Sequence, residues 1–172
     1  MKIELKKLKI AEHMSEETTA FTAEIYVDGV NAGYAKNDGR GGCTDYHHNP
    51  DQKSKDLMRK AEAHCLTLPP IKYPASHGMK AFDVKMNLEN LIDQFVEDEL
   101  KRKDQKKLEK KMVNSIMWGV PNAGSYTQLK QPRPLSDYAL PALQGAVDRI
   151  KKDFKKGEQF LNTNFEALGI KI

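Results

Sequence analysis

The sequence is poor in cysteine and in uninterrupted apolar stretches, and each shortage excludes a class of protein. Two cysteines, Cys43 and Cys65, are too few for a disulfide-stapled secreted domain, and both are expected to be free thiols. No run approaches the roughly 20 consecutive apolar residues that a membrane span requires. The start of the chain also lacks the apolar core of a signal peptide. We therefore expect a cytoplasmic protein without a membrane partner.

A strong excess of one charge is also missing. The 172 residues include 28 basic and 24 acidic side chains, for a formal net charge of +4. This mild excess permits binding to anions but falls short of the dense basic patch that is typical of nucleic-acid-binding proteins. The hydrophobic content of 39% suffices for a continuous core, and the length fits one domain. We expect a single α+β domain over residues 1–172, with nucleic acid as a less favoured partner than a small anion.

The amino-terminal part of the chain, residues 2–37, predicts an antiparallel β-meander. Phe21, Ala23, Ile25 and Val27 follow each other at two-residue spacing, which places one face of a strand on a core. The Asp28-Gly29 pair that follows favours a tight hairpin turn. The strands are expected at residues 2–11, 18–28 and 31–37.

Apolar residues at helical spacing predict three amphipathic helices. Asn49 would cap the first, Asn87 would cap the second, and Gly157 would end the third. A proline-containing connection separates the first two helices. A second hairpin with its tip at 119–124 and a short strand at 160–164 complete the predicted fold, an antiparallel meander and a hairpin packed with about three helices. The helices are expected near 50–67, 88–110 and 137–156, the connection at 68–85, and the hairpin strands at 112–118 and 125–131.

The most unusual segment is the glycine-rich loop, which we define as residues 36–48. Gly39, Gly41 and Gly42 let backbone N–H groups turn toward a ligand, and Arg40 supplies a planar cation. A helix start near Pro50 would add its positive end. The loop therefore predicts an anion site, although its spacing matches neither common glycine-rich nucleotide motif and a plain surface turn is the alternative. The residues expected to contact the ligand are Lys36, Asn37, Asp38, Arg40, Gly41, Gly42, Thr44, Tyr46 and His47.

Catalysis and metal binding are the less favoured interpretations of the same segment. Cys43 with His47 or His48 would make a nucleophile and base, oriented by Asp45, and Asp38 with Asp45 would make an acid and base pair. Closeness in sequence is weak evidence, because catalytic partners usually come from distant segments. Cysteine and histidine are zinc ligands, yet the paired spacing of zinc sites is missing. We assign no catalytic residue, metal or cofactor, and we expect Cys65 to be a small buried residue.

Two further segments combine basic and aromatic residues. Tyr126, Lys130 and Arg133, with Trp118 nearby, would suit the base and phosphate of a nucleotide, while packing is the alternative that we favour for the aromatic rings. The basic cluster at 101–111 is interleaved with carboxylates, so we interpret it as a solvated helix face.

Four segments together resemble a family of small uncharacterised proteins carried by phages and mobile elements of gut bacteria. They are residues 33–46, 68–75, 102–107 and 161–164. The resemblance covers most of the chain and carries no catalytic motif. It implies a protein of the bacterial host cell that acts by binding, for instance by sequestering a nucleotide signal in counter-defence.

The leading hypothesis is thus a non-enzymatic, oligomerising protein that binds an anionic ligand such as a nucleotide at the glycine-rich loop. One alternative is a protein- or nucleic-acid-interaction module that inhibits a host factor. The other is a small enzyme that uses Cys43 or the Asp38 and Asp45 pair.

Overall fold

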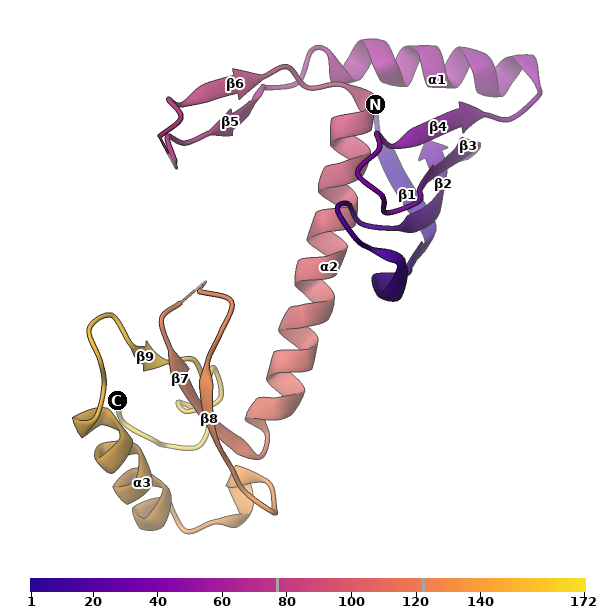
Figure 1. Cartoon of the computed structure of the whole chain (residues 1–172). Helices are drawn as coiled ribbons and strands as arrows, with labels where there is room; N and C mark the ends of the chain where they lie inside the picture. Colours follow the sequence, from indigo (N-terminus) through magenta and orange to yellow (C-terminus); the bar gives the residue numbers. More distant parts are fainter. Residues whose placement is uncertain (77, 122) are drawn as a thin grey trace. The chain divides into compact units, whose positions relative to one another are not determined.

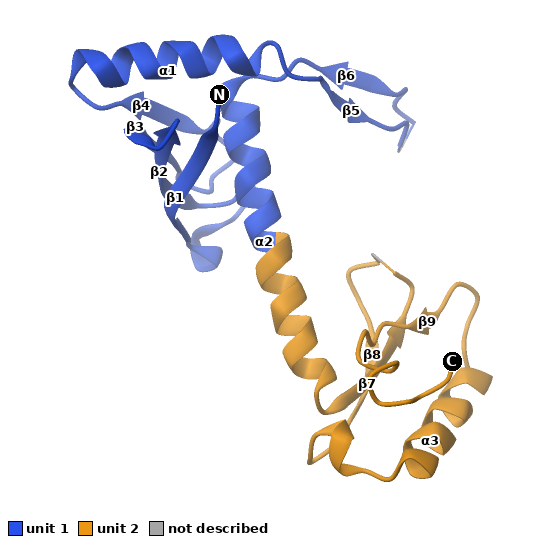
Figure 2. Ribbon diagram, turned by 180° about the vertical axis from the view of Figure 1, so that it is seen from behind, with its two compact units in different colours: residues 1–100 blue, residues 101–172 orange. Residues whose placement is uncertain are grey.

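The computed structural model describes residues 1–76, 78–121 and 123–172, and its architecture is α+β, as predicted (Figure 1). The chain divides into two compact units, residues 1–100 and 101–172 (Figure 2). We describe each unit by itself, and the single domain over 1–172 stays a prediction. Among the described residues, no helix combines the length and the apolar character needed to cross a membrane.

The first unit is built on a four-stranded antiparallel sheet in the order β1-β2-β3-β4. The meander prediction is confirmed, and both residues of the Asp28-Gly29 turn have positive φ, at 48° and 83°. The fourth strand is a correction, because the last residues of the predicted loop pair with β3, with Tyr34 opposite His47. The strands are β1 (Ile3–Ile10), β2 (Phe21–Val27), β3 (Val30–Asn37) and β4 (Asp45–His48).

Two helices bury the inner face of this sheet. The first is α1 (Gln52–Cys65) and the second is α2 (Leu88–Met112), whose residues up to Leu100 belong to the first unit. Their apolar stripes join the alternate inward residues of the strands in one buried core. Its fully buried members include Ile25, Val27, Ala32, Ala61, Cys65, Leu88, Ile92 and Val96.

The helix caps agree with the sequence in one case and differ in the other. Asn87 caps α2 as predicted, since its Oδ1 accepts a 2.7 Å hydrogen bond from the backbone N–H of Asn90. The cap of α1 is Asp51, whose side chain accepts from Ser54 N at 2.9 Å. Asn49, the predicted cap, instead donates to the backbone oxygen of Asn31 at 3.0 Å and thereby ties the end of β4 to β3.

The proline-containing connection contains a short antiparallel pair that the sequence prediction missed. Its strands are β5 (Ile71–Tyr73) and β6 (Phe82–Val84), with Tyr73 stacked on Phe82 at 5.0 Å between ring centroids. Both strands are only three residues long, which is too short for the alternation pattern to be visible among prolines.

The second unit holds a three-stranded antiparallel sheet in the order β8-β7-β9. The predicted hairpin is confirmed as β7 (Ser115–Gly119) and β8 (Thr127–Lys130), and Asn122 of its tip lies outside the described residues. The predicted short strand is β9 (Gln159–Phe160). Trp118 is half-buried and packs against the core of this unit, so packing is its role here. That core consists of Ile116, Leu135, Leu143, Val147, Phe160, Phe165 and Ile170.

The third helix, α3 (Leu140–Lys152), is shorter than the predicted 137–156. The helix begins later than predicted because Asp137 belongs to a separate 3-10 turn over Leu135–Asp137. Its end moves because the backbone N–H of Asp153 already caps the helix by donating to Ile150 and Lys151 carbonyls. Gly157, with φ of 87°, serves the turn before β9 and does not end the helix.

Candidate functional site

The residues of the predicted anion site do not form one cluster. Asn37, Gly41, Gly42 and Thr44 face a hollow beside α2. The other five lie elsewhere: Lys36 and His47 on the outer face of the sheet, Tyr46 against α1, and Asp38 and Arg40 exposed on the loop.

The backbone of the glycine-rich loop is held by the chain itself. Asn37 Oδ1 accepts from Gly39 N at 2.8 Å and from Thr18 Oγ1 at 2.9 Å, while its Nδ2 donates to Gly42 O at 3.0 Å. The N–H of Gly41 donates to Thr18 Oγ1 at 3.3 Å. Two of the three glycine N–H groups that were expected to face an anion are therefore already bonded within the protein.

The loop meets acidic side chains of α2 instead of the amino end of α1. Thr44 donates from its N–H to Glu89 Oε1 at 3.1 Å and from its hydroxyl to Asp93 Oδ1 at 2.6 Å. Burial raises the pKa of Asp93, the hydrogen bond from Thr44 opposes this, and the charge of Glu89 raises the pKa further. The hollow has a volume of about 400 Å³ and is also lined by Glu97, so three carboxylates surround it. Such a hollow repels anions.

A different cluster lies on the outer face of the sheet, which we call the open face because Thr22, Tyr34 and His47 are exposed there. The strand register aligns its side chains in two rows across the sheet, since residues opposite each other point to the same side. One row is Lys9, Thr22, Lys36 and Asp45, and the other is Lys6, Glu24, Tyr34 and His47.

A bulge in β1 enriches the open face in lysine. The register of β1 against β2 shifts between Lys6 and Lys9, and Lys7 adopts a positive φ of 51°, which is uncommon for a residue with a side chain. Regular alternation would send Lys6 and Lys7 to opposite faces. With the extra residue, Lys7 Nζ reaches Glu24 on the open face at 2.8 Å, while Leu8 packs on the core side.

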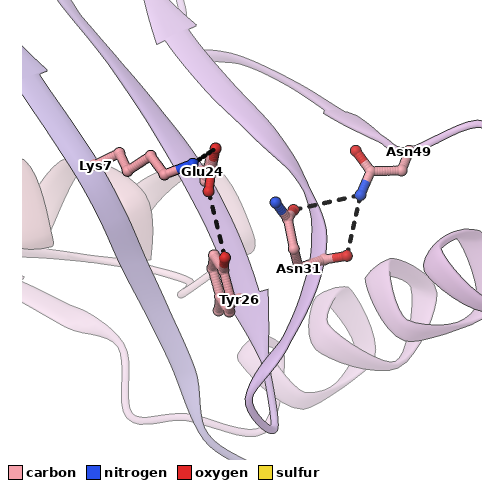
Figure 3. A network of polar contacts seen from close by, with 5 residues as sticks. All are labelled: Lys7, Glu24, Tyr26, Asn31 and Asn49. Carbon is pink, nitrogen blue, oxygen red and sulfur yellow. Dashed lines mark hydrogen bonds and ion pairs between the residues drawn. The ribbon is translucent and has the colours of Figure 1, made fainter.

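The contacts of Glu24 and Tyr26 organise the centre of the open face (Figure 3). Glu24 binds Lys7 and also accepts from the hydroxyl of Tyr26 at 3.4 Å, and Lys6 Nζ lies 4.0 Å from the centroid of the Tyr26 ring. The hydrogen bond and charge of Glu24 raise the pKa of Lys7. The negative charge of Glu24 is therefore matched within the protein.

A hollow of about 390 Å³ lies between the two rows of the open face. Three lysines line it, Lys7, Lys9 and Lys36, and neither Lys9 nor Lys36 forms an ion pair with a described residue. The ring of Tyr34 forms one wall, is 46% exposed, and lies 5.3 Å from the ring of His47. Cations and exposed ring faces thus meet in one place.

Tyr46 and Cys65 pack within the first unit, and Cys43 lies on its surface. Tyr46 donates from its hydroxyl to Glu62 Oε1 at 3.2 Å, and burial raises its pKa. Cys65 is fully buried in the first core, as predicted, and burial also raises the pKa of its thiol. Cys43 is exposed, and no hydrogen bond joins it to His47 or His48 among the described residues. Within residues 1–76, 78–121 and 123–172, no three His, Cys, Asp or Glu side chains are placed to hold a metal ion.

The second hairpin does not bring its predicted set together. Tyr126 contacts Lys111 of α2, with Lys111 Nζ donating to its hydroxyl at 2.8 Å. Arg133 lies over the ring of Tyr138 at 5.0 Å, in the segment between β8 and α3. The nucleotide site suggested by these residues in sequence is therefore not formed as a unit.

The sequence prediction missed Lys7, Lys9, Glu24 and Tyr34 as site residues. The alternation that assigned Phe21 to Val27 to the core at every second position assigns the residues in between to the other face. Thr22, Glu24 and Tyr26 could therefore be found from the same pattern. The bulge at Lys7 also leaves a signal, because the spacing of the apolar residues Ile3, Leu5, Leu8 and Ile10 changes from two to three between Leu5 and Leu8.

Comparison of the chain with protein-family models, with curated proteins and with solved structures finds no match.

Proposed function

We propose that the protein is a non-enzymatic binding protein whose ligand carries a phosphate and an aromatic base, and that the open face of the β1–β4 sheet binds this ligand. The observation that carries the proposal is the hollow between Lys9, Lys36 and Tyr34. Two lysines without ion pairs lie beside an exposed aromatic ring there, which are the groups that a phosphate and a base require.

The chemistry of each half of the ligand has a counterpart on the open face. Lysine ammonium groups attract phosphates as point charges with rotatable donors. An exposed tyrosine ring offers a stacking surface, which is worth about 1–3 kcal/mol per base and tolerates any base. The single carboxylate in the hollow, Glu24, is paired with Lys7, so it opposes an anion less than a free carboxylate would.

This proposal keeps the anionic ligand expected from the sequence but assigns it to the open face and no longer to the glycine-rich loop. Lys36 and His47 remain binding residues. The loop segment 38–44 does not, because the N–H groups of Gly39 and Gly41 are engaged by Asn37 and Thr18 and its hollow faces Glu89 and Asp93.

Binding is tested by fluorescence anisotropy with a labelled single-stranded oligonucleotide of mixed sequence, and by calorimetry with ATP. Tyr34→Leu removes the stacking ring, and Lys36→Met removes one charge while keeping the length of the side chain. We expect each change to weaken binding about tenfold. Lys60→Met, on the exposed surface of α1, is the matched control for net charge and is expected to bind as the wild type does.

Comparing the two ligands distinguishes a strand of nucleic acid from a free nucleotide, which carry the same phosphate and base groups. Binding of both, with higher affinity for the oligonucleotide, identifies a strand of nucleic acid, and binding of ATP alone identifies a free nucleotide. Affinity for either should fall as salt is raised, because the attraction is between charges. If neither ligand binds, or if Tyr34→Leu and Lys36→Met bind as well as Lys60→Met, the proposal is wrong.

The resemblance to proteins of phages and mobile elements suggests where such binding would act. We propose that the protein works in the cytoplasm of a bacterial host and sequesters a nucleotide signal of host defence. Expression of the wild type, but not of Tyr34→Leu, should then protect a phage from a nucleotide-signalled defence system, as measured by plating efficiency. Equal protection by both would refute this role.

A further inference from the structure

The second unit contains a groove that has no part in the function proposed for the open face. It lies between the carboxyl-terminal half of α2 and the connection from β7 to β8, and it has a volume of about 550 Å³. That volume falls within the range of pockets that bind small molecules, roughly 300–1,000 Å³.

The groove is lined by apolar side chains, which we call its floor, and by lysines, which we call its rim. Leu108, Val120 and Leu161 contribute apolar surface, while Lys101, Lys107 and Lys111 come from the carboxyl-terminal half of α2. Lys107 and Lys111 are four residues apart and therefore lie one turn apart on the same side of α2. A segment that looks like a solvated face in sequence thus borders one side of a groove in the fold.

The charges within the groove leave an excess of cations. Asp104 is the one carboxylate among the described lining residues, and it is paired with Lys107 at 3.3 Å. Lys111 Nζ donates to the hydroxyl of Tyr126 at 2.8 Å and lies 5.5 Å from the centroid of its ring. This contact gives the ammonium group of Lys111 a neutral partner, and no ion pair of Lys111 is present within residues 1–76, 78–121 and 123–172.

We propose that this groove binds a small amphipathic anion, a molecule with one carboxylate, sulfonate or phosphate group on an apolar body. The apolar body would cover Leu108, Val120 and Leu161, and the anionic group would lie beside Lys111. A molecule without the charge would leave the lysine rim unused, and one without the apolar body would leave the floor exposed to water. The proposal is independent of the open face, because it uses other residues and another unit.

The experiment uses 1-anilinonaphthalene-8-sulfonate, an aromatic sulfonate that fluoresces when bound to apolar surface, and the neutral N-phenyl-1-naphthylamine. With the full chain, we expect the sulfonate to bind saturably and at least about tenfold more tightly than the neutral probe. Lys111→Met should weaken sulfonate binding by roughly the same factor. Val120→Asp, a change at a 44% exposed position, should weaken both probes.

Lys110→Met is the matched control, since Lys110 lies on the same helix and is exposed but does not line the groove. It changes the net charge by the same amount and should leave binding unchanged. Circular dichroism melting of each variant checks that the fold is retained. Equal binding of both probes, or equal binding by Lys111→Met and Lys110→Met, would overturn the proposal, as would sulfonate binding that is insensitive to Val120→Asp.

Discussion

The hydroxyl of Thr44 donates a 2.6 Å hydrogen bond to Oδ1 of Asp93, which joins the end of the glycine-rich loop to the second turn of α2. Thr44 is only 5% exposed, although its neighbours in the loop are open to solvent. Its N–H is bound as well, to Glu89 at 3.1 Å. The loop that looked in sequence like a ligand cradle is thus anchored at this residue to the acidic side of a helix, and the anchor explains why its hollow is negative.

The pH dependence of stability should report the environment of Asp93. Burial raises its pKa above the ordinary value of 3.8, so the folded state binds a proton more readily than the unfolded state does. The free energy of unfolding contributed by this group is therefore highest below that value and falls as the pH rises through the raised pKa. Asp93→Asn keeps an acceptor for Thr44 and removes the titration, so we expect a flatter profile and no loss of stability at neutral pH.

Urea denaturation at a series of pH values measures this profile. Thr44→Val provides the complementary variant, because it removes the hydrogen bond that lowers the pKa of Asp93. In Thr44→Val, the free energy of unfolding should therefore keep falling up to a higher pH than in the wild type. The loss of the hydrogen bond should also destabilise the protein by about 1–3 kcal/mol. If the profiles of the wild type and Asp93→Asn coincide, the pKa of Asp93 is the same in the folded and the unfolded state and the argument fails.

Two glycines in the loop should respond differently to the same substitution. Gly39 has a φ of +84°, and an added Cβ would overlap the carbonyl oxygen of Met14. Since that atom belongs to the backbone, we expect Gly39→Ala to destabilise the protein by about 2–4 kcal/mol. Gly42 has open space around it and no positive φ, so Gly42→Ala should change stability by less than about 0.5 kcal/mol. Thermal and urea denaturation of the pair give the comparison, and equal costs would contradict the described loop conformation.

Asn162 should be a main stabilising residue of the second unit. Its Oδ1 accepts from Met117 N at 2.6 Å, and its Nδ2 donates to Ser115 O at 2.9 Å, so one side chain bonds two backbone groups of β7. Asn162→Ala leaves both backbone groups without this partner and should cost about 2–4 kcal/mol.

Thr163→Ala is the control for Asn162, because Thr163 is exposed and its hydroxyl makes only a 3.6 Å contact with the Met112 sulfur. It should cost less than about 0.5 kcal/mol. Hydrogen exchange adds a local readout, since the amide of Met117 should lose protection in Asn162→Ala. Unchanged protection there would show that the side chain does not hold the strand.

The prediction of elements from sequence worked where the signal is local. The alternation of Phe21 to Val27, the Asp28-Gly29 turn and the Asn87 cap each involve residues a few positions apart, and each is present in the structure. The predictions failed where partners are distant. Asn49 looked like a cap but bonds to Asn31, and residues 45–48 looked like loop but pair with β3.

The residues of the candidate site were likewise predicted from the sequence only in part. Lys36 and His47 were predicted as binding residues, yet their neighbours on the open face are Lys9 and Tyr34, which come from other strands. Register between strands depends on which face of each strand is buried along its whole length, so it cannot be read from a single segment.

The amino-acid sequence by itself determined the α+β class, the meander, the buried Cys65 and the apolar stripes of the helices, because periodicity and turn chemistry act over a few residues. The tertiary structure alone decided that Lys7, at the bulge of β1, pairs with Glu24 of β2 on the open face. It also decided that the glycine-rich loop faces Glu89 and Asp93. Both outcomes follow from contacts between distant segments, whose free energy depends on packing of the whole unit and cannot be derived from one segment of the sequence.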